Sequence, residues 1–291
     1  PRIVYCSISG YGQTGPYRDK VGHDLNYIGL TGVLAATGTR DGRLAIPIVQ
    51  VGDIAGGGLM ATCAILSALH HVARGGEGQH LDVSIFDGLI SVMNVHIVKS
   101  QIENETPGPG DSFLTGRFVC YDVYRTKDGE HVTLAALEPK FWKSFCETVG
   151  RPEWIPYQYA TGHIGDRIRG ELKEMFLSRT RREWALLFEP TDSCVEPVQK
   201  LEELFCDPHV VHRGMILDTE HPGEGRIRQV GIPVKFSATP CGIRSQSPGF
   251  GEHTEEVLRR IGLSDREIAE LAVQKVVARA VDNQGVEQSE H

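Results

Sequence analysis

Several features that would place this chain in a special class are missing from its sequence. Its seven cysteines are scattered, odd in number and never spaced as Cys-x-x-Cys, which argues against a disulfide framework and a zinc ribbon. We therefore expect reduced thiols and a cytoplasmic protein, or one in a peroxisomal or mitochondrial matrix. The terminal Gln-Ser-Glu-His291 is not a Ser-Lys-Leu peroxisomal signal. No charged segment followed by an apolar core opens the chain, so we expect no secretory signal.

Excess positive charge and long apolar runs are also missing. Thirty basic against 38 acidic residues give a net charge of −8, which argues against a nucleic-acid partner. The longest uncharged run, Ile54 to Leu69, is 16 residues long, below the ~20 needed to span a bilayer. It predicts a buried helix and no membrane partner. No metal-ligand spacing is present, whereas 40% hydrophobic and 23% charged residues are typical of a globular enzyme.

The order of the expected elements indicates an α/β fold. Residues 3–8 are β-branched and bounded by Ser9-Gly10, which predicts a buried strand. Residues 54–73 predict a helix and 80–86 a second strand, followed by a helix over 87–101. Because the chain opens on a strand without Met, we expect it to be a fragment whose earlier part is absent.

Changes in composition divide the chain into expected domains. Residues 1–101 form the large domain, and 102–116, with two prolines and three glycines, form a linker. A hairpin and helices predict a small α+β domain over 117–200. Residues 201–275 are expected to be a return linker and the C-terminal part of the large domain, and the polar residues 276–291 a disordered tail.

A glycine-rich turn follows the first strand. Gly10-x-Gly12-x-x-Gly15 superficially matches a dinucleotide fingerprint, which needs a helix at the third glycine and an acid about twenty residues later. Pro16 follows instead, and residues 33–38 contain no acid. The turn therefore argues against nicotinamide binding and favours backbone that approaches some other ligand.

Three candidate site residues each have a plain structural explanation. His23 could be a structural histidine held by its neighbour. Asp53 precedes a helix, where a carboxylate caps free amides, and Glu138 precedes Pro139 at another helix start. Glycines 56–58 follow Asp53, however, and could let a ligand approach the helix amides, which would stabilise a negative oxygen.

Taken together, these segments resemble a known family. Tyr5-Cys-Ser-Ile-Ser-Gly-Tyr-Gly-Gln-Thr-Gly-Pro16 resembles the signature of the family III CoA-transferases (CaiB/BaiF type), a superfamily that includes an acyl-CoA racemase branch. The likeness continues in Gly22-His-Asp-Leu-Asn-Tyr27, Asp53-Ile-Ala-Gly-Gly-Gly-Leu59, Gly76-Glu-Gly-Gln-His-Leu-Asp-Val83, Leu137-Glu-Pro-Lys-Phe141, Thr191-Asp-Ser-Cys-Val-Glu-Pro-Val198 and Gly251-Glu-His-Thr-Glu-Glu-Val-Leu258. It therefore extends over nearly the whole chain.

The resemblance implies a fold and two alternative activities. The fold is an incomplete Rossmann-like large domain with a smaller α+β domain, in a dimer of interlocked chains. Transferases of the superfamily attack the thioester with an aspartate, here Asp53, and form an anhydride. Racemases carry His, Asp and Glu at the positions of His23, Asp53 and Glu138, and all three are present. This favours a racemase of 2-methyl-branched acyl-CoA over a CoA-transferase, and over a third hypothesis, a non-catalytic binding module.

Inversion at the α-carbon of a thioester needs a base on one face and an acid on the other. We expect His23 and Asp53 to fill these roles, with Glu138 of one subunit bonded to His23 of its partner. The segment expected to contact coenzyme A comprises Gly22, His23, Asp24, Leu25, Asn26 and Tyr27. Coenzyme A enters only as part of the substrate, and no bound cofactor or metal is expected. The basic residues that bind the CoA phosphates in the family are absent from this chain, so we expect catalysis to require the complete protein.

Overall fold

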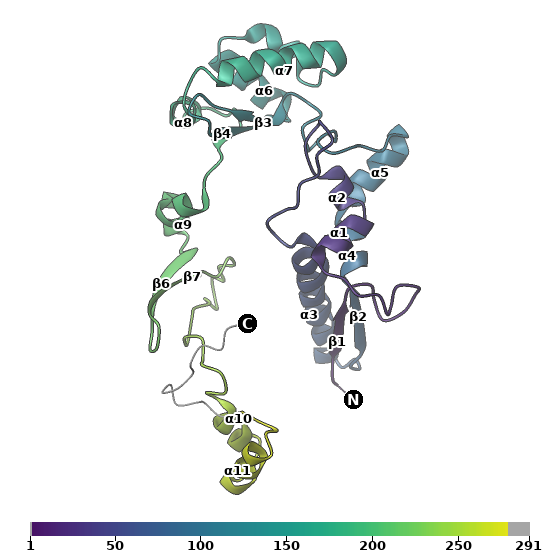
Figure 1. The fold of residues 1–291 in the computed structure, drawn as a ribbon, viewed down its shortest axis with the longest axis vertical. Coiled ribbons are helices and arrows are strands. Elements are labelled where there is room, and N and C mark those ends of the chain that lie inside the picture. Colours follow the sequence, from purple (N-terminus) through teal and green to yellow (C-terminus); the bar gives the residue numbers. More distant parts are fainter. Residues whose placement is uncertain (1, 279–291) are drawn as a thin grey trace. The chain divides into compact units, whose positions relative to one another are not determined.

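The computed structural model describes residues 2–278. The chain folds as two units, Pro1–Val198 and Gln199–His291. Residues 279–291, most of the expected C-terminal tail, lie outside the described residues. The fold is mixed α/β, as the order of elements predicts (Figure 1).

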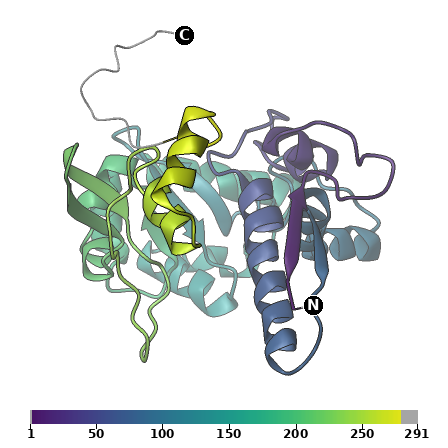
Figure 2. The same ribbon diagram turned by 90° about the horizontal axis from the view of Figure 1, so that it is seen from below.

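The first unit begins with a parallel strand pair. Strand β1 (Tyr5–Ser9) pairs with β2 (His80–Ser84) in a register that sets Tyr5 opposite His80. Parallel strands need a long crossover connection. This one contains α1 (Asp24–Leu30), α2 (Val33–Ala36), η1 (Gly52–Leu59) and α3 (Met60–Ala73). Figure 2 shows α3 running beside the two strands.

The crossover helix begins with π-helical turns and packs tightly on its neighbour. Segment η1 is a π-helix that continues directly into α3, so the helix starts two residues before the expected 54–73. Gly56 lies against Gly88 of α4 (Ile85–Val92): a Cβ added to Gly88 would lie 2.2 Å from the Gly56 carbonyl oxygen. Gly56 and Gly57 are buried by this packing. Glycines 56 and 57 therefore serve close helix packing rather than the approach of a ligand.

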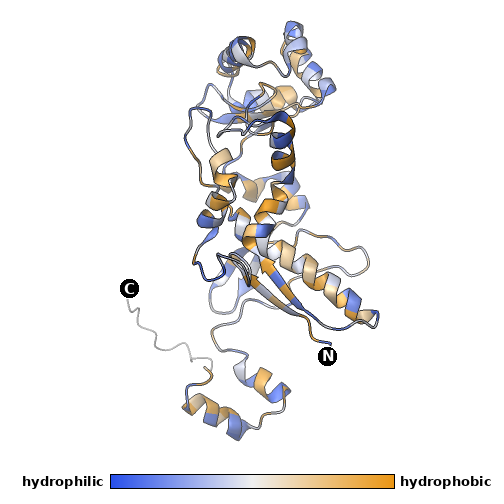
Figure 3. Cartoon of the chain, turned by 90° about the vertical axis from the view of Figure 1, so that its right-hand side faces the viewer, coloured by the Kyte–Doolittle hydropathy of each residue, from blue (hydrophilic) through white to orange (hydrophobic). Residues whose placement is uncertain are grey.

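The prediction of a buried helix over this run is wrong for the chain described. The helix Gly52–Ala73 has 22 residues, yet only 28% of its most apolar stretch is buried. Ile54, Leu59 and Leu66 are exposed, because β1, β2 and α4 cover only one side (Figure 3). By length and composition this is the one described helix that could cross a membrane, but core helices of soluble proteins pass the same test. No membrane role follows from it.

The helix expected over 87–101 is two helices. Helix α4 begins earlier, because the Ser84 hydroxyl accepts a hydrogen bond from the Asp87 amide at its first turn. It ends before Met93, and α5 (Asn94–Glu103) follows. The segment after α5 is irregular from Asn104 onward, so the first two residues of the expected linker 102–116 belong to the helix.

An α+β layer occupies the rest of the first unit. Strands β3 (Tyr121–Arg125), β4 (His131–Ala135) and β5 (Val195–Pro197) form an antiparallel sheet in that order. The helices are α6 (Pro139–Thr148), η2 (Pro152–Tyr157), α7 (Gly162–Phe176) and α8 (Arg181–Phe188). Their buried faces stack aromatic rings, among them Phe145 on Phe188 with centroids 5.7 Å apart. This core gives the layer a rigid frame.

The second unit is small and built from local pairs. It contains η3 (Leu201–Cys206), α9 (Pro208–His212), the hairpin β6 (Ile216–His221) with β7 (Gly225–Val230), and helices α10 (Thr254–Arg260) and α11 (Asp265–Val273). The hairpin turns at Pro222-Gly-Glu224, between His221 and Gly225. All seven cysteines are free.

Candidate active site

The start of the crossover helix is capped from a distant part of the chain. One carboxylate oxygen of Asp24, Oδ1, accepts hydrogen bonds from the Gly52 amide at 2.7 Å and the Asp53 amide at 3.1 Å. The structural explanation of Asp53 as the cap of this helix is therefore wrong, because Asp24 supplies the cap.

The same two contacts overturn a second expectation. The sequence predicts that amides at the start of this helix stabilise a negative oxygen of the substrate. Those of Gly52 and Asp53 already donate to Asp24, and the Ile54 amide donates to the Gln50 carbonyl oxygen. The prediction is wrong for these three donors.

The Asp53 carboxyl group is exposed and lies among titratable neighbours. Its pKa is raised by partial burial and then by the negative charge of Asp24, while the charge of His23 acts in the opposite direction. A raised pKa increases the fraction of the carboxyl that holds a proton. The structure thus brings His23, Asp24 and Asp53 together at the junction of α1 and η1.

His23 stands at the N-terminus of α1 with its side chain exposed. Its backbone is extended, and its amide donates to Oδ1 of Asn26 at 3.0 Å. This bond replaces one that the helix cannot make at its first residue. The backbone that carries the imidazole is therefore fixed, while the ring faces outward.

A tyrosine cluster supports the residues beside His23. The Tyr27 hydroxyl donates to the Gly22 carbonyl oxygen, and a Cβ on Gly22 would lie 2.9 Å from the Tyr27 ring. Burial raises the pKa of Tyr27, and Tyr11 and Asp53 add to the shift. Tyr11 is 8% exposed, and its hydroxyl has no hydrogen-bond partner within the described residues. The cluster places aromatic side chains directly behind the candidate site.

Most residues of the segment expected to contact coenzyme A also stabilise the local fold. The side chains of Asp24, Asn26 and Tyr27 hold neighbouring backbone, as described above, and Gly22 packs against Tyr27. Leu25 and His23 are exposed. Contact of these six residues with coenzyme A stays a prediction.

Glu138 lies elsewhere in the first unit. It directly precedes α6, is exposed, and its side chain makes no capping hydrogen bond. Its charge contributes to the raised pKa values of Tyr159 and Cys194, after burial in both cases. Within one chain the structure therefore groups Glu138 with Tyr159 and Cys194, while the charges that act most on Asp53 are those of Asp24 and His23.

The glycine turn after β1 does not open a helix. Gly12 and Gly15 both have φ of +87°, and α1 begins only at Asp24. The Gln13 amide donates to the carboxylate of Asp82 on β2, at 2.9 Å to the nearer oxygen. A dinucleotide fingerprint needs a helix that opens at the third glycine, and the described chain forms none at Gly15; the helix N-terminus beside the turn is that of α4, whose Phe86 amide donates to the Gly10 carbonyl oxygen at 3.0 Å.

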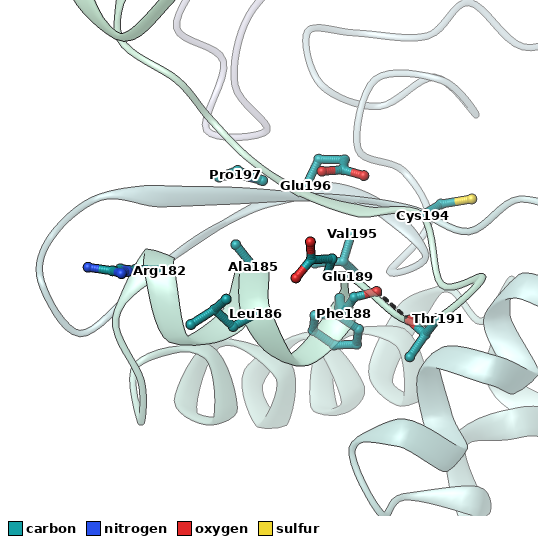
Figure 4. A pocket seen from close by; sticks show the side chains of 10 residues that line it. All are labelled: Arg182, Ala185, Leu186, Phe188, Glu189, Thr191, Cys194, Val195, Glu196 and Pro197. Atoms are coloured by element: carbon teal, nitrogen blue, oxygen red, sulfur yellow. Dashed lines mark hydrogen bonds between the residues drawn. The ribbon is translucent and has the colours of Figure 1, made fainter. Parts of the chain in front are cut away.

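His23, Asp53 and Glu138 do not line the cavity drawn in Figure 4, whereas Cys194 does. The cavity measures about 390 Å³ and lies over α8 and β5. Its lining comprises Arg182, Ala185, Leu186, Phe188, Glu189, Thr191, Cys194, Val195, Glu196 and Pro197. Two glutamates and an arginine make it a poor match for an acyl chain. Within the described residues, no group of three or more His, Cys, Asp or Glu side chains is arranged to hold a metal ion.

Comparison with known proteins identifies the family. The sequence profile of CoA-transferase family III matches residues 1–254. The chain belongs to CoA-transferase family III. Alpha-methylacyl-CoA racemase from Homo sapiens is 32% identical over 279 residues, which cover 95% of this chain and 72% of that protein.

Other family III members are similar at comparable levels. Succinyl-CoA:glutarate CoA-transferase from Homo sapiens is 30% identical over 283 residues, covering 95% of this chain and 64% of that enzyme. A CaiB/BaiF family protein from Brucella suis matches the structure with a TM-score of 0.73 and 25% identity, covering 90% of this chain and 68% of that one. These likenesses establish the family fold, and the similar proteins include both a racemase and a CoA-transferase.

Sequence reasoning missed the role of Asp24 as the helix cap. Capping is normally sought at the residue before a helix, whereas this cap comes from about thirty residues earlier. No pattern of neighbouring residues in the sequence predicts such a contact. The one signal was Asp24 itself, an acid in a polar group inside an apolar region.

Two substitutions of Asp24 distinguish the effect of its capping hydrogen bonds from the effect of its negative charge. Asp24→Ala leaves two helix amides without an acceptor, and we expect it to destabilise the fold by about 1–2 kcal/mol. Asp24→Asn keeps an oxygen acceptor and should cost less, but it removes the negative charge and should lower the pKa of Asp53. Urea unfolding measures the first effect and NMR titration of the Asp53 carboxyl carbon the second. An unchanged Asp53 pKa in Asp24→Asn would contradict the electrostatic account.

Proposed function

We propose that this protein is an acyl-CoA racemase that inverts the α-carbon of 2-methyl-branched acyl-CoA thioesters. The observation that carries the proposal is the grouping of an exposed imidazole, His23, with an exposed carboxyl group, Asp53, whose pKa is raised. A base and an acid at one site are what inversion through an enolate requires. The likeness to the human racemase supports the same reaction.

The reaction balances with these two groups alone. Neutral His23 takes the α-proton, and the electrons of the broken C–H bond pass into the enolate of the thioester. Protonated Asp53 then donates its proton to the opposite face of the α-carbon, and the thioester carbonyl forms again. The enzyme is left with protonated His23 and ionised Asp53, the form that starts the reverse reaction. The total number of titrating protons on His23 and Asp53 is therefore the same before and after the reaction, in either direction.

Asp24 supports this chemistry by raising the pKa of Asp53. Its carboxylate is bound to the backbone amides of Gly52 and Asp53, which holds a negative charge beside the acid. The like charge favours the protonated form of Asp53, which is the proton donor. Asp24 therefore both caps the helix and raises the pKa of Asp53 in the proposed site.

We further propose that the working site is shared between two copies of the chain. Glu138 is exposed, free of a capping bond, and grouped with Tyr159 and Cys194 rather than with Asp53. In a homodimer of interlocked chains, Glu138 of one subunit would accept a hydrogen bond from His23 of the other. Such a bond fixes the tautomer of the imidazole and stabilises the imidazolium that forms. Coenzyme A takes part as the thiol half of the substrate, not as a separately bound cofactor.

CoA transfer between carboxylic acids is the second candidate function. It is favoured by the same free carboxyl group of Asp53 and by the transferases among the relatives. In its first step an oxygen of ionised Asp53 attacks the thioester carbonyl carbon, the C–S bond breaks, and CoA thiolate leaves an acyl-aspartyl anhydride. This route gives no role to His23.

Incubation in heavy water without an acceptor acid distinguishes the two functions. A racemase exchanges the α-proton of 2-methylacyl-CoA for deuterium, followed by proton NMR, and forms no adduct that hydroxylamine can trap. A transferase gives a hydroxamate on Asp53, detected by mass spectrometry, and leaves the α-proton in place. The second pattern would replace the racemase assignment by the transferase one.

A further inference from the structure

We infer that Gln158 and Tyr159 are positioning residues for Glu138. This inference rests on the proposed role of Glu138 in the shared site. The two residues follow η2 and reach back to the loop between β4 and α6, which ends at Glu138. Neither residue belongs to the segments through which the sequence resembles the family.

Both side chains bind the backbone directly before Glu138. The Gln158 side-chain amide donates to the carbonyl oxygens of Ala136 and Leu137, each at 2.9 Å. The Tyr159 hydroxyl donates to the Leu137 carbonyl oxygen as well. The peptide that joins Leu137 to Glu138 thus receives two donors from one short segment. Gln158 is only 6% exposed, so its bonds are protected from competing water.

Further backbone groups of this loop are also bound. The Ala136 amide donates to the Cys120 carbonyl oxygen at 2.9 Å. On the far side, the Glu138 carbonyl oxygen accepts from the amides of Phe141 and Trp142 at the start of α6. Trp142 is buried in the aromatic core and anchors that helix. The backbone of Glu138 is therefore held from both directions.

The carboxyl group of Glu138 remains free while its backbone is fixed. The side chain is exposed and makes no capping bond. Burial and then Cys120 raise the pKa of the Tyr159 hydroxyl, and the charge of Glu138 adds to the shift. A fixed backbone with a free carboxylate is suited to a hydrogen bond across an interface, because little conformational entropy is lost when the partner subunit binds. The hydrogen bonds from Gln158 and Tyr159 fix this backbone in advance.

Tyr159→Phe tests the inference with little risk to the fold, because Tyr159 is 48% exposed. It removes the hydroxyl and leaves the ring. We expect kcat of the full-length enzyme to fall about 10-fold or more, as for other residues that orient a reacting group, with KM within about twofold of wild type. Tyr157→Phe removes a hydroxyl from the same short segment and is the matched control. It should leave kcat unchanged.

A double-mutant cycle separates positioning from a general structural role. In a Glu138→Gln background the residue that Tyr159 positions no longer works, so Tyr159→Phe should cause no further loss of kcat. If the two losses multiply, or if Tyr159→Phe alone leaves kcat unchanged while Glu138→Gln lowers it, the positioning role is wrong. If Glu138→Gln itself has no effect, the proposed role of Glu138 fails first, and the two failures are thus distinct.

Discussion

Replacing His23 by alanine is expected to lower α-proton exchange of a 2-methylacyl-CoA by about 1,000-fold, the range lost when a general base is removed. The imidazole is exposed and the backbone bond to Asn26 does not involve the ring, so the variant should fold normally. Proton NMR in heavy water measures the exchange, and thermal unfolding checks the fold. Inversion, followed by chiral separation of the acids, should fall in parallel.

The control for this variant is His163→Ala, which removes an exposed histidine from α7 and should leave exchange unchanged. A His23→Ala enzyme that still exchanges at the wild-type rate would remove the histidine from the mechanism. The site would then have Asp53 as its one reacting group, as the transferase alternative requires.

Mixing two inactive variants is expected to restore activity. His23→Ala and Glu138→Gln homodimers should each be nearly inactive. In a mixed dimer with a shared site, His23 of the Glu138→Gln chain meets the intact Glu138 of the other chain, so one site of two is complete. Co-expression with different affinity tags and purification through both tags should yield about half the wild-type turnover per dimer, by this count of intact sites.

The opposite arrangement gives an opposite result. If Glu138 acted on His23 of its own chain, each site of the mixed dimer would carry one defect, and the purified mixture would be as inactive as its parents. Co-expressed chains that both carry Glu138→Gln control for the effect of the tags. Absence of rescue alongside an intact dimer would overturn the shared site.

The sequence predicts those parts of the fold that depend on local pattern. The hairpin expected within residues 117–200 is β3–β4, which turns at Lys127-Asp-Gly129, and the strand expected over 80–86 is β2. The crossover helix follows from an uninterrupted apolar run. Its exposure does not, because burial depends on which other surfaces cover a helix, and periodicity carries no information on that.

The site depends on contacts that span long distances in the sequence. Asp53 and the capping Asp24 are brought together by folding, so spacing assigns the cap to the wrong aspartate. The sequence pattern favours Gly56 as an opening for a ligand, whereas the backbone of α4 fills that space, with the Ile85 carbonyl oxygen nearest. The grouping of His23 with Asp53 is expected from the family resemblance alone. The bonds from Gln158 and Tyr159 to the Glu138 loop have no sequence signal.

The central claim is that His23 and Asp53 act on opposite faces of one α-carbon, and the isotope content of the first product tests it most directly. One pure enantiomer is incubated in heavy water, the reaction is stopped after a few per cent conversion, and both enantiomers are separated for mass spectrometry. Because His23 removes the α-proton and Asp53 supplies a deuteron taken from the solvent, the account predicts deuterium in nearly all of the inverted product and almost none in the recovered substrate. Inverted product that retains the original proton would show one group acting on both faces and would contradict the account.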